Sequence, residues 1–183
     1  MVFMIAHARG RERIRPSIPK SLVLVVAGAA GGALAAVLPV VAASGVAPRD
    51  RLIVAAALAV AVLAASVARD RPWQFDVETP TAWLERPGAW PAALNGLALG
   101  AGAVTRLGFW LAWLLPLAAF AVGGLRGLAI GALYGATRLG VSAVLAWAPP
   151  GRLALDRRVA GRAASLALVL GTGYLATAAV GIA

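Results

Sequence analysis

Long apolar runs separated by short polar segments dominate the chain and set its predicted fold. The runs cover residues 22–43, 52–68, 92–120, 127–148 and 163–182. At about 1.5 Å per residue, each run can cross the ~30 Å hydrocarbon core of a bilayer, although the second is at the lower limit of length. The pattern therefore predicts an all-α fold, a polytopic integral membrane helix bundle with five transmembrane helices.

The third run leaves an alternative open, because 92–120 is longer than one straight crossing needs. It predicts either one long helix, tilted or kinked at Pro116, or two short spans broken near Arg106, which would give six. Cytoplasmic loops carry an excess of Lys and Arg. One crossing puts twelve basic residues on the side of the N-terminus and three on the other, whereas two crossings give nine against seven. The charges favour five spans with a cytoplasmic N-terminus.

The chain is predicted to form a single transmembrane domain, 1–183, with three polar segments. Residues 1–21 read as a basic cytoplasmic tail, 149–162 as a basic loop and 69–91 as an amphipathic loop rich in tryptophan. A basic start before an apolar run also fits a cleavable secretory signal, but 22–43 is longer than the usual apolar region of about 7–15 residues. The tryptophan-rich loop is either a connector anchored in the headgroup layer or a docking loop over a cavity.

Two predicted helices carry the same sequence. The segment 96–101 (GLALGA) recurs as 127–132 (GLAIGA), and 105–108 (TRLG) recurs unchanged as 137–140. The first pair is offset by 31 residues and the second by 32, so the second copy has one additional residue between its two matching segments. The repeat predicts two related membrane helices.

Glycines at four-residue spacing predict where the helices approach closely, because a small residue lets two backbones meet. The predicted packing positions in the repeat are Gly96, Gly100, Gly127, Gly131 and Gly135. Gly28 and Gly32 give the first run the same spacing. Arg138 follows Gly131 by seven residues, so the helical period predicts that it lies on the glycine face.

Each copy of the repeat also places one arginine, Arg106 or Arg138, inside an apolar helix. A charge at membrane depth is costly by about 3 kcal/mol or more and marks a candidate functional site. Three interpretations stay open. The arginines snorkel or bind backbone carbonyls, with Thr105, Thr137 and Tyr134 as polar neighbours; they line a wet cavity that receives an anion or lipid headgroup; or they pair with a carboxylate of a partner subunit. These five residues form the candidate ligand- or partner-binding site.

Composition removes several other functions. Hydrophobic residues make up 61% of the chain, so the formal charge of +10 is explained by basic flanks of membrane spans rather than by nucleic-acid binding. The chain has no cysteine and a single histidine, His7. We therefore expect no metal site and no cofactor. The sequence contains neither a nucleophile elbow nor a phosphate-binding loop, and we expect no enzymatic activity.

A segment of the chain from about residue 73 to 140 resembles known proteins. After a tryptophan-containing loop, its ordered motif positions are Asn95, Gly96, Leu99, Gly100, Gly102, Thr105, Gly127, Gly131, Tyr134, Gly135 and Arg138. This order resembles uncharacterised small multi-span membrane proteins of high-GC bacteria and, more distantly, the CcdA/DsbD-like transmembrane reductant carriers. That family moves electrons through a membrane cysteine pair. Because this chain has no cysteine, the resemblance implies at most a shared scaffold.

These observations predict a small-molecule or ion transporter, or a subunit of a membrane transport complex, with a polar site around the intramembrane arginines. The predicted location is the bacterial inner membrane, with membrane lipid as a partner. The alternative is a non-catalytic scaffold that assembles with a membrane protein or a second copy through its glycine-rich faces. A transporter requires a polar cavity at the arginines, whereas a scaffold requires an exposed glycine stripe.

Overall fold

The structure is a computed structural model that describes residues 18–69, 72, 89–102, 110–147 and 157–181. Every element in these ranges is helical, which confirms the all-α prediction for the described residues. The elements are α2 (Ile18–Ser44), α3 (Pro48–Ala68), α5 (Ala89–Ala101), the 3-10 helix η2 (Trp110–Trp113), α6 (Leu114–Val122), α7 (Gly124–Trp147) and α8 (Arg157–Gly181).

Three described helices have the properties of membrane spans. Helices α2 and α3 and the segment Arg162–Gly181 of α8 are long and apolar enough to cross a membrane. They expose large aliphatic side chains: Leu38 is 78% exposed and Val67 is 86% exposed. Soluble monomers rarely carry extended apolar surfaces. The fold is therefore that of a helical membrane bundle.

The third apolar run does not form one helix. Helix α5 ends at Ala101, and the next described helix begins only at Trp110. Gly102 adopts a φ of 71°, a left-handed conformation that closes α5. Pro116 lies in the first turn of α6, where a missing N–H leaves no hydrogen bond unmade. The prediction of an uninterrupted or Pro116-kinked helix over 92–120 is therefore wrong, and Arg106 lies outside the described residues.

The helices extend beyond the apolar runs into polar residues. Helix α2 begins at Ile18, α3 at Pro48 and α8 at Arg157, so the predicted tail 1–21 and basic loop 149–162 are too long. Hydropathy detects the part of a helix that suits hydrocarbon, whereas a first turn tolerates proline and acidic residues. The first turn of α3 contains both. The tryptophan-rich loop is also shorter than predicted, because α5 begins at Ala89; residues 70–71 and 73–88 lie outside the described residues.

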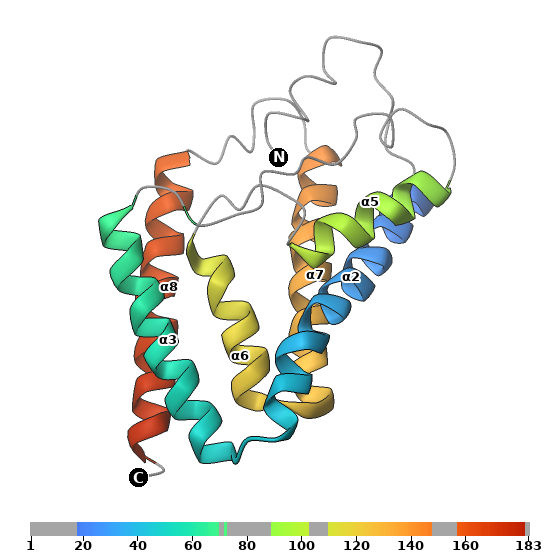
Figure 1. The fold of residues 1–183 in the computed structure, drawn as a ribbon. Coiled ribbons are helices and arrows are strands. Elements are labelled where there is room, and N and C mark those ends of the chain that lie inside the picture. The colour runs from blue at the N-terminus through green and yellow to red at the C-terminus, as the bar shows by residue number, and fades with distance from the viewer. Residues whose placement is uncertain (1–17, 70–71, 73–88, 103–109, 148–156, 182–183) are drawn as a thin grey trace.

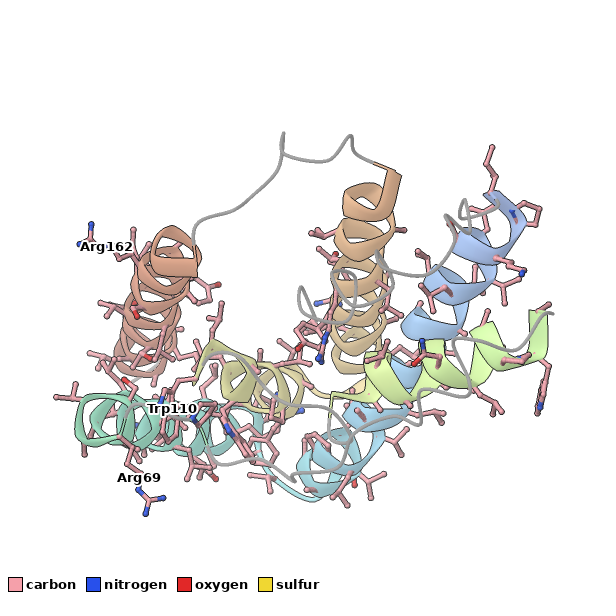
Figure 2. The ribbon with its side chains drawn as sticks, turned by 90° about the horizontal axis from the view of Figure 1, so that it is seen from above. Arg69, Trp110 and Arg162 are labelled. Carbon is pink, nitrogen blue, oxygen red and sulfur yellow. The ribbon has the colours of Figure 1, made fainter. Side chains whose placement is uncertain are left out.

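The helices form two groups (Figures 1 and 2). Helices α2, α5 and α7 pack together on one side, and α3, η2–α6 and α8 pack together on the other. The second group shares an apolar core formed mainly by Ala55, Ala56, Ala59, Trp110, Leu114, Leu168, Leu175 and Ala179. Helix α6 also contacts α2 and α7, and it therefore joins the two groups.

Both ends of the η2–α6 segment are bound to the ends of α3. The indole Nε1–H of Trp110 donates a hydrogen bond to the carbonyl of Arg69, at 3.0 Å. At the other end, Nη1 of Arg51 lies 3.5 Å from the carbonyl oxygen of Val122. Trp110 is 7% exposed, and its position beside the end of α3 is visible in Figure 2. These contacts align α6 antiparallel to α3.

Glycine contacts hold the first group together around Gly28 of α2. A Cβ atom added to either Gly100 of α5 or Gly135 of α7 would overlap the carbonyl oxygen of Gly28. Gly131 faces the carbonyl of Gly32 in the same way. Since only glycine lacks a Cβ, these backbones lie closer than any other residue would permit. Gly28 is thus the point at which both copies of the repeat meet α2.

The two copies of the repeat run in opposite directions along α2. Gly96 lies against Leu24, with an added Cβ 2.6 Å from its carbonyl oxygen, and Gly100 lies against Gly28. Gly131, however, lies against Gly32 and Gly135 against Gly28. Along the α2–α5 contact, the residue numbers of both helices therefore rise together. Along the α2–α7 contact, the residue numbers of α7 rise as those of α2 fall. Helix α5 is parallel to α2 and α7 is antiparallel to it, as Figure 1 shows.

We predict that Gly135→Ala lowers the free energy of unfolding by about 1–3 kcal/mol, because the new methyl group would overlap the Gly28 backbone. Gly140→Ala on the same helix is the matched control, since an added Cβ there has no atom within 4 Å. It should leave stability unchanged or raise it by up to about 1 kcal/mol. Unfolding in detergent, followed by helical circular dichroism, measures both. Equal effects of the two substitutions would contradict the Gly28 contact.

Candidate functional site

The candidate site centres on Arg138, which lies past the middle of α7 and is half-buried. Its Nη1 lies 3.4 Å from the hydroxyl of Tyr134, one turn earlier on the same helix. The guanidinium carbon is 6.0 Å from the centroid of the Tyr134 ring, at the outer range of a cation–π contact. The side chain thus leans back toward the start of α7, as helical side chains do. Two predicted site residues, Arg138 and Tyr134, are therefore in contact.

The break after α5 faces this pair. A Cβ added to Gly102 would lie 3.5 Å from Nη1 of Arg138 and 3.8 Å from Cε1 of Tyr134. The guanidinium therefore lies beside the residue that directly follows the last turn of α5. The final carbonyl groups of a helix lack intrahelical partners and carry a partial negative charge, which favours a nearby cation. The end of α5 therefore offers Arg138 a favourable electrostatic environment.

Arg138 borders the glycine contact rather than continuing it. The residue that follows Gly131 and Gly135 against α2 is Leu139, which is 0% exposed and would overlap a Cβ on Gly28. Closely packed helices often interdigitate along rows of four-residue spacing, and 131, 135 and 139 form such a row. The prediction that Arg138 lies on the glycine face is therefore corrected. Arg138 points past that face, toward the end of α5.

Asn95 adds a buried polar group on α5. It is 3% exposed, and its Oδ1 has no hydrogen-bond partner within the described part of the chain. Asn95 and Leu99 are both buried and share one face of α5 by helical spacing. An unsatisfied buried amide is costly, by about 1–3 kcal/mol, and polar groups at membrane depth are typical of functional sites.

The other predicted site residues fall in different places. Arg106 and Thr105 lie outside the described residues, and Thr137 is exposed on α7. The five repeat glycines are all buried at helix–helix contacts: Gly96, Gly100, Gly127, Gly131 and Gly135. The glycine stripe therefore lies inside the chain and is not exposed. In the searched, described ranges, no group of three His, Asp or Glu side chains could hold a metal ion.

Two residues of the site were not singled out from sequence. Asn95 and Gly102 entered only through the family resemblance. An asparagine inside an apolar run is a usable signal, because polar side chains at membrane depth mark helix contacts or sites. Gly102 offers no such signal. The chain contains 21 glycines, and nothing local distinguishes the one that ends a helix.

Comparisons with other proteins do not assign this site. No family model, curated protein or solved structure matches the chain. The resemblance to multi-span membrane proteins and to the reductant carriers therefore stays a prediction. What the described geometry offers chemically is a guanidinium beside the end of a helix, with a phenol next to it.

We predict that Gly102→Ala lowers the free energy of unfolding by about 1–2 kcal/mol, because φ of 71° strains a residue with a Cβ. Steric overlap is not the cause, since the nearest atom to the new Cβ is at 3.5 Å. Gly102→Asn should cost less, because asparagine tolerates the left-handed conformation. Chemical unfolding of both variants separates backbone strain from crowding. A larger loss for asparagine than for alanine would show that space, not φ, requires glycine.

Proposed function

We propose that the chain is an integral membrane transport protein, or a transport subunit, that binds a small anion or an anionic group of a small molecule at Arg138. The observation that carries this proposal is the half-buried guanidinium beside the break that follows α5. Transporters commonly bind substrates near the bilayer midplane, where discontinuous helices present their ends.

The repeat supports the same function. Many transporter folds contain two related segments with inverted topology, and the binding site lies at the interface between them. Here the two copies contact α2 in opposite directions, and Arg138 of the second copy lies beside Gly102, at the end of the first. The site therefore occupies the position that such repeats use for ligand binding.

The chemistry of the site favours an anionic ligand. A guanidinium presents a planar set of donors that binds carboxylate or phosphate at two points. The Tyr134 hydroxyl beside it can donate or accept a hydrogen bond. Asn95 of α5, seven residues before Gly102, is a further buried polar group, and its Oδ1 has no hydrogen-bond partner within the described residues. These groups can orient a small polar ligand in an apolar bundle.

The alternative, a scaffold that recruits a partner through its glycine faces, is less well supported. Gly100, Gly131 and Gly135 are already occupied by contacts with α2 of the same chain. A scaffold would have to use another surface. This observation leaves transport as the function that the geometry favours.

Helix directions and charge support a crossing pattern. In Figure 1, α2, α6 and α8 run one way and α3 and α7 run the other, whereas α5 lies obliquely beside the first part of α2. This arrangement is compatible with five crossings in which the broken α5–α6 pair makes one. The α2–α3 and α6–α7 turns lie at the end of the bundle opposite the start of α2, the end of α3 and the start of α8, as Figure 1 shows. Among the described residues, the latter end carries five basic residues, Lys20, Arg69, Arg157, Arg158 and Arg162, and the other end carries three, Arg49, Arg51 and Arg126. This excess supports a cytoplasmic N-terminus.

The proposed site predicts a graded response to substitution of Arg138. Arg138→Lys should reduce anion flux at least about tenfold, because lysine loses the two-point contact, and a hydrogen bond to a charged group contributes about 1.5–3 kcal/mol. Arg138→Leu should insert equally well and abolish flux. Efflux of chloride, phosphate and succinate from reconstituted vesicles is the measurement.

Arg126→Leu is the control for that experiment, because Arg126 is exposed near the start of α7 and does not face the break. It should retain flux. The same changes at Arg106 should be milder than those at Arg138. If Arg138→Leu transports every anion as fast as the unmodified chain, Arg138 is not the binding residue.

The proposed topology predicts the sides of two positions. Reporter fusions at residues 125 and 155 should lie on opposite sides of the membrane, with 155 cytoplasmic, because α7 crosses between them. Six crossings, with α5 and α6 as separate spans, require 125 in the cytoplasm and 155 outside. Activities of paired cytoplasmic and periplasmic reporters distinguish the two. The second result would refute the five-crossing proposal.

A further inference from the structure

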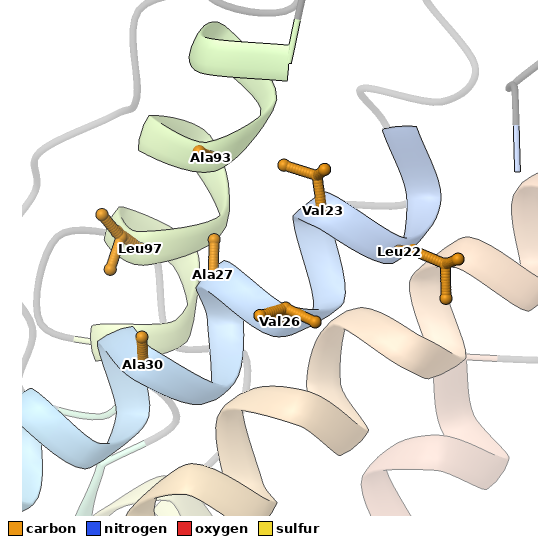
Figure 3. A pocket seen from close by; sticks show the side chains of 7 residues that line it. All are labelled: Leu22, Val23, Val26, Ala27, Ala30, Ala93 and Leu97. Atoms are coloured by element: carbon orange, nitrogen blue, oxygen red, sulfur yellow. The ribbon is translucent and has the colours of Figure 1, made fainter. Parts of the chain in front are cut away.

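An apolar groove lies on the outer face of the bundle between α2 and α5. Its volume is about 420 Å³, within the range of ligand-binding pockets, about 300–1,000 Å³. Five lining residues come from α2 and two from α5 (Figure 3): Leu22, Val23, Val26, Ala27, Ala30, Ala93 and Leu97. All of these side chains are aliphatic. The groove is therefore suited to a hydrocarbon chain.

The groove follows from the glycine contact. Helices α2 and α5 run parallel and touch where Gly96 meets Leu24 and where Gly100 meets Gly28. The groove runs along this contact, from Leu22 to Ala30 of α2. Three of its lining side chains, Ala27, Ala30 and Ala93, are small and leave the surface recessed. From Leu22 to Ala30 the groove extends for about 12 Å at the helical rise. It is much shorter than a membrane-spanning helix of ~30 Å, which disfavours a partner helix as its occupant.

Two residues at the open end fit a lipid headgroup. Lys20, Val23 and Ala27 share one face of α2 by three- and four-residue spacing, so the exposed Lys20 lies in line with the groove. Trp90, 71% exposed, precedes Ala93 and Leu97 on α5 with the same spacing. Tryptophan prefers the headgroup layer, and a basic residue near a membrane surface attracts anionic lipid.

We propose that this groove binds one anionic phospholipid, with an acyl chain between α2 and α5 and the phosphate at Lys20. The assignment rests on charge complementarity at Lys20 and on an aliphatic lining that ends in an interfacial tryptophan. It is independent of the site at Arg138. The bound lipid fills the groove that runs along the contact between the two helices.

The test is native mass spectrometry of the full chain in detergent with equimolar phosphatidylglycerol and phosphatidylcholine of identical acyl chains. The unmodified chain should retain one lipid, with phosphatidylglycerol favoured several-fold. Lys20→Gln should reduce that preference to about one while an adduct persists. Arg162→Gln, an exposed basic residue near the start of α8, should leave the preference unchanged.

Filling the groove tests the acyl-chain position. Ala30 is exposed, so Ala30→Phe should preserve folding yet remove the retained lipid. Ala93→Phe repeats the test from the opposite wall, and Ala57→Phe, on the exposed face of α3, is the matched control. Retention of phosphatidylglycerol in folded Ala30→Phe and Ala93→Phe would overturn the proposal. An unchanged lipid preference in Lys20→Gln would also overturn it. A dimer that only the groove variants dissociate would do the same, because the groove would then be an interface between two copies of the chain.

Discussion

The close approach of three helix backbones at Gly28 is the contact on which the rest of the structure depends. Lipid tails are as apolar as the side chains of the helices, so burial provides little drive for helices to associate. Close packing must supply it, and an α-carbon without a Cβ permits the closest packing. Because Gly100 and Gly135 both meet the Gly28 carbonyl, α2 fixes the position of α5 relative to α7. The distance between Gly102 and Arg138 is a consequence of that arrangement.

The helix break and the arginine depend on each other. In a continuous helix over 92–120, the carbonyls near residue 100 would be hydrogen-bonded along the chain and would offer no negative end. Ending α5 at Ala101 places the C-terminal turn of a helix, which carries a partial negative charge, near Arg138. The cation in turn reduces the cost of ending a helix inside an apolar bundle, where free backbone groups are expensive. Each feature alone would be destabilising, and together they form a polar site.

Sequence periodicity could predict the parts of this arrangement that depend on residue type. The amino-acid sequence alone shows the repeat, the glycine spacing, the arginine inside an apolar run and the long apolar runs. The break at Gly102 is not, because a left-handed φ is a conformation and not a composition. The crossing of α2 and α7 also decides which residue packs against α2 after Gly131 and Gly135. That residue is Leu139, and helical spacing alone could not identify it. Similarly, hydropathy could not locate the start of α8 at Arg157, since charged first turns lie outside the apolar signal.

The same sequence can bind α2 in both directions because a glycine contact has little directional character. With no side chain to interdigitate, a parallel and an antiparallel backbone approach Gly28 equally closely. The copies differ after their shared glycines. At the offset of 32 that relates the two arginines, Gly102 corresponds to Tyr134, and these two residues face each other, with an added Gly102 Cβ 3.8 Å from the tyrosine ring. One copy has a ring where the other has only a hydrogen atom, so the equivalent positions fit together. The helix of the first copy ends before Gly102, whereas the helix of the second copy continues through Tyr134 to Arg138. The first copy therefore contributes a helix end to the site, and the second contributes the side chains.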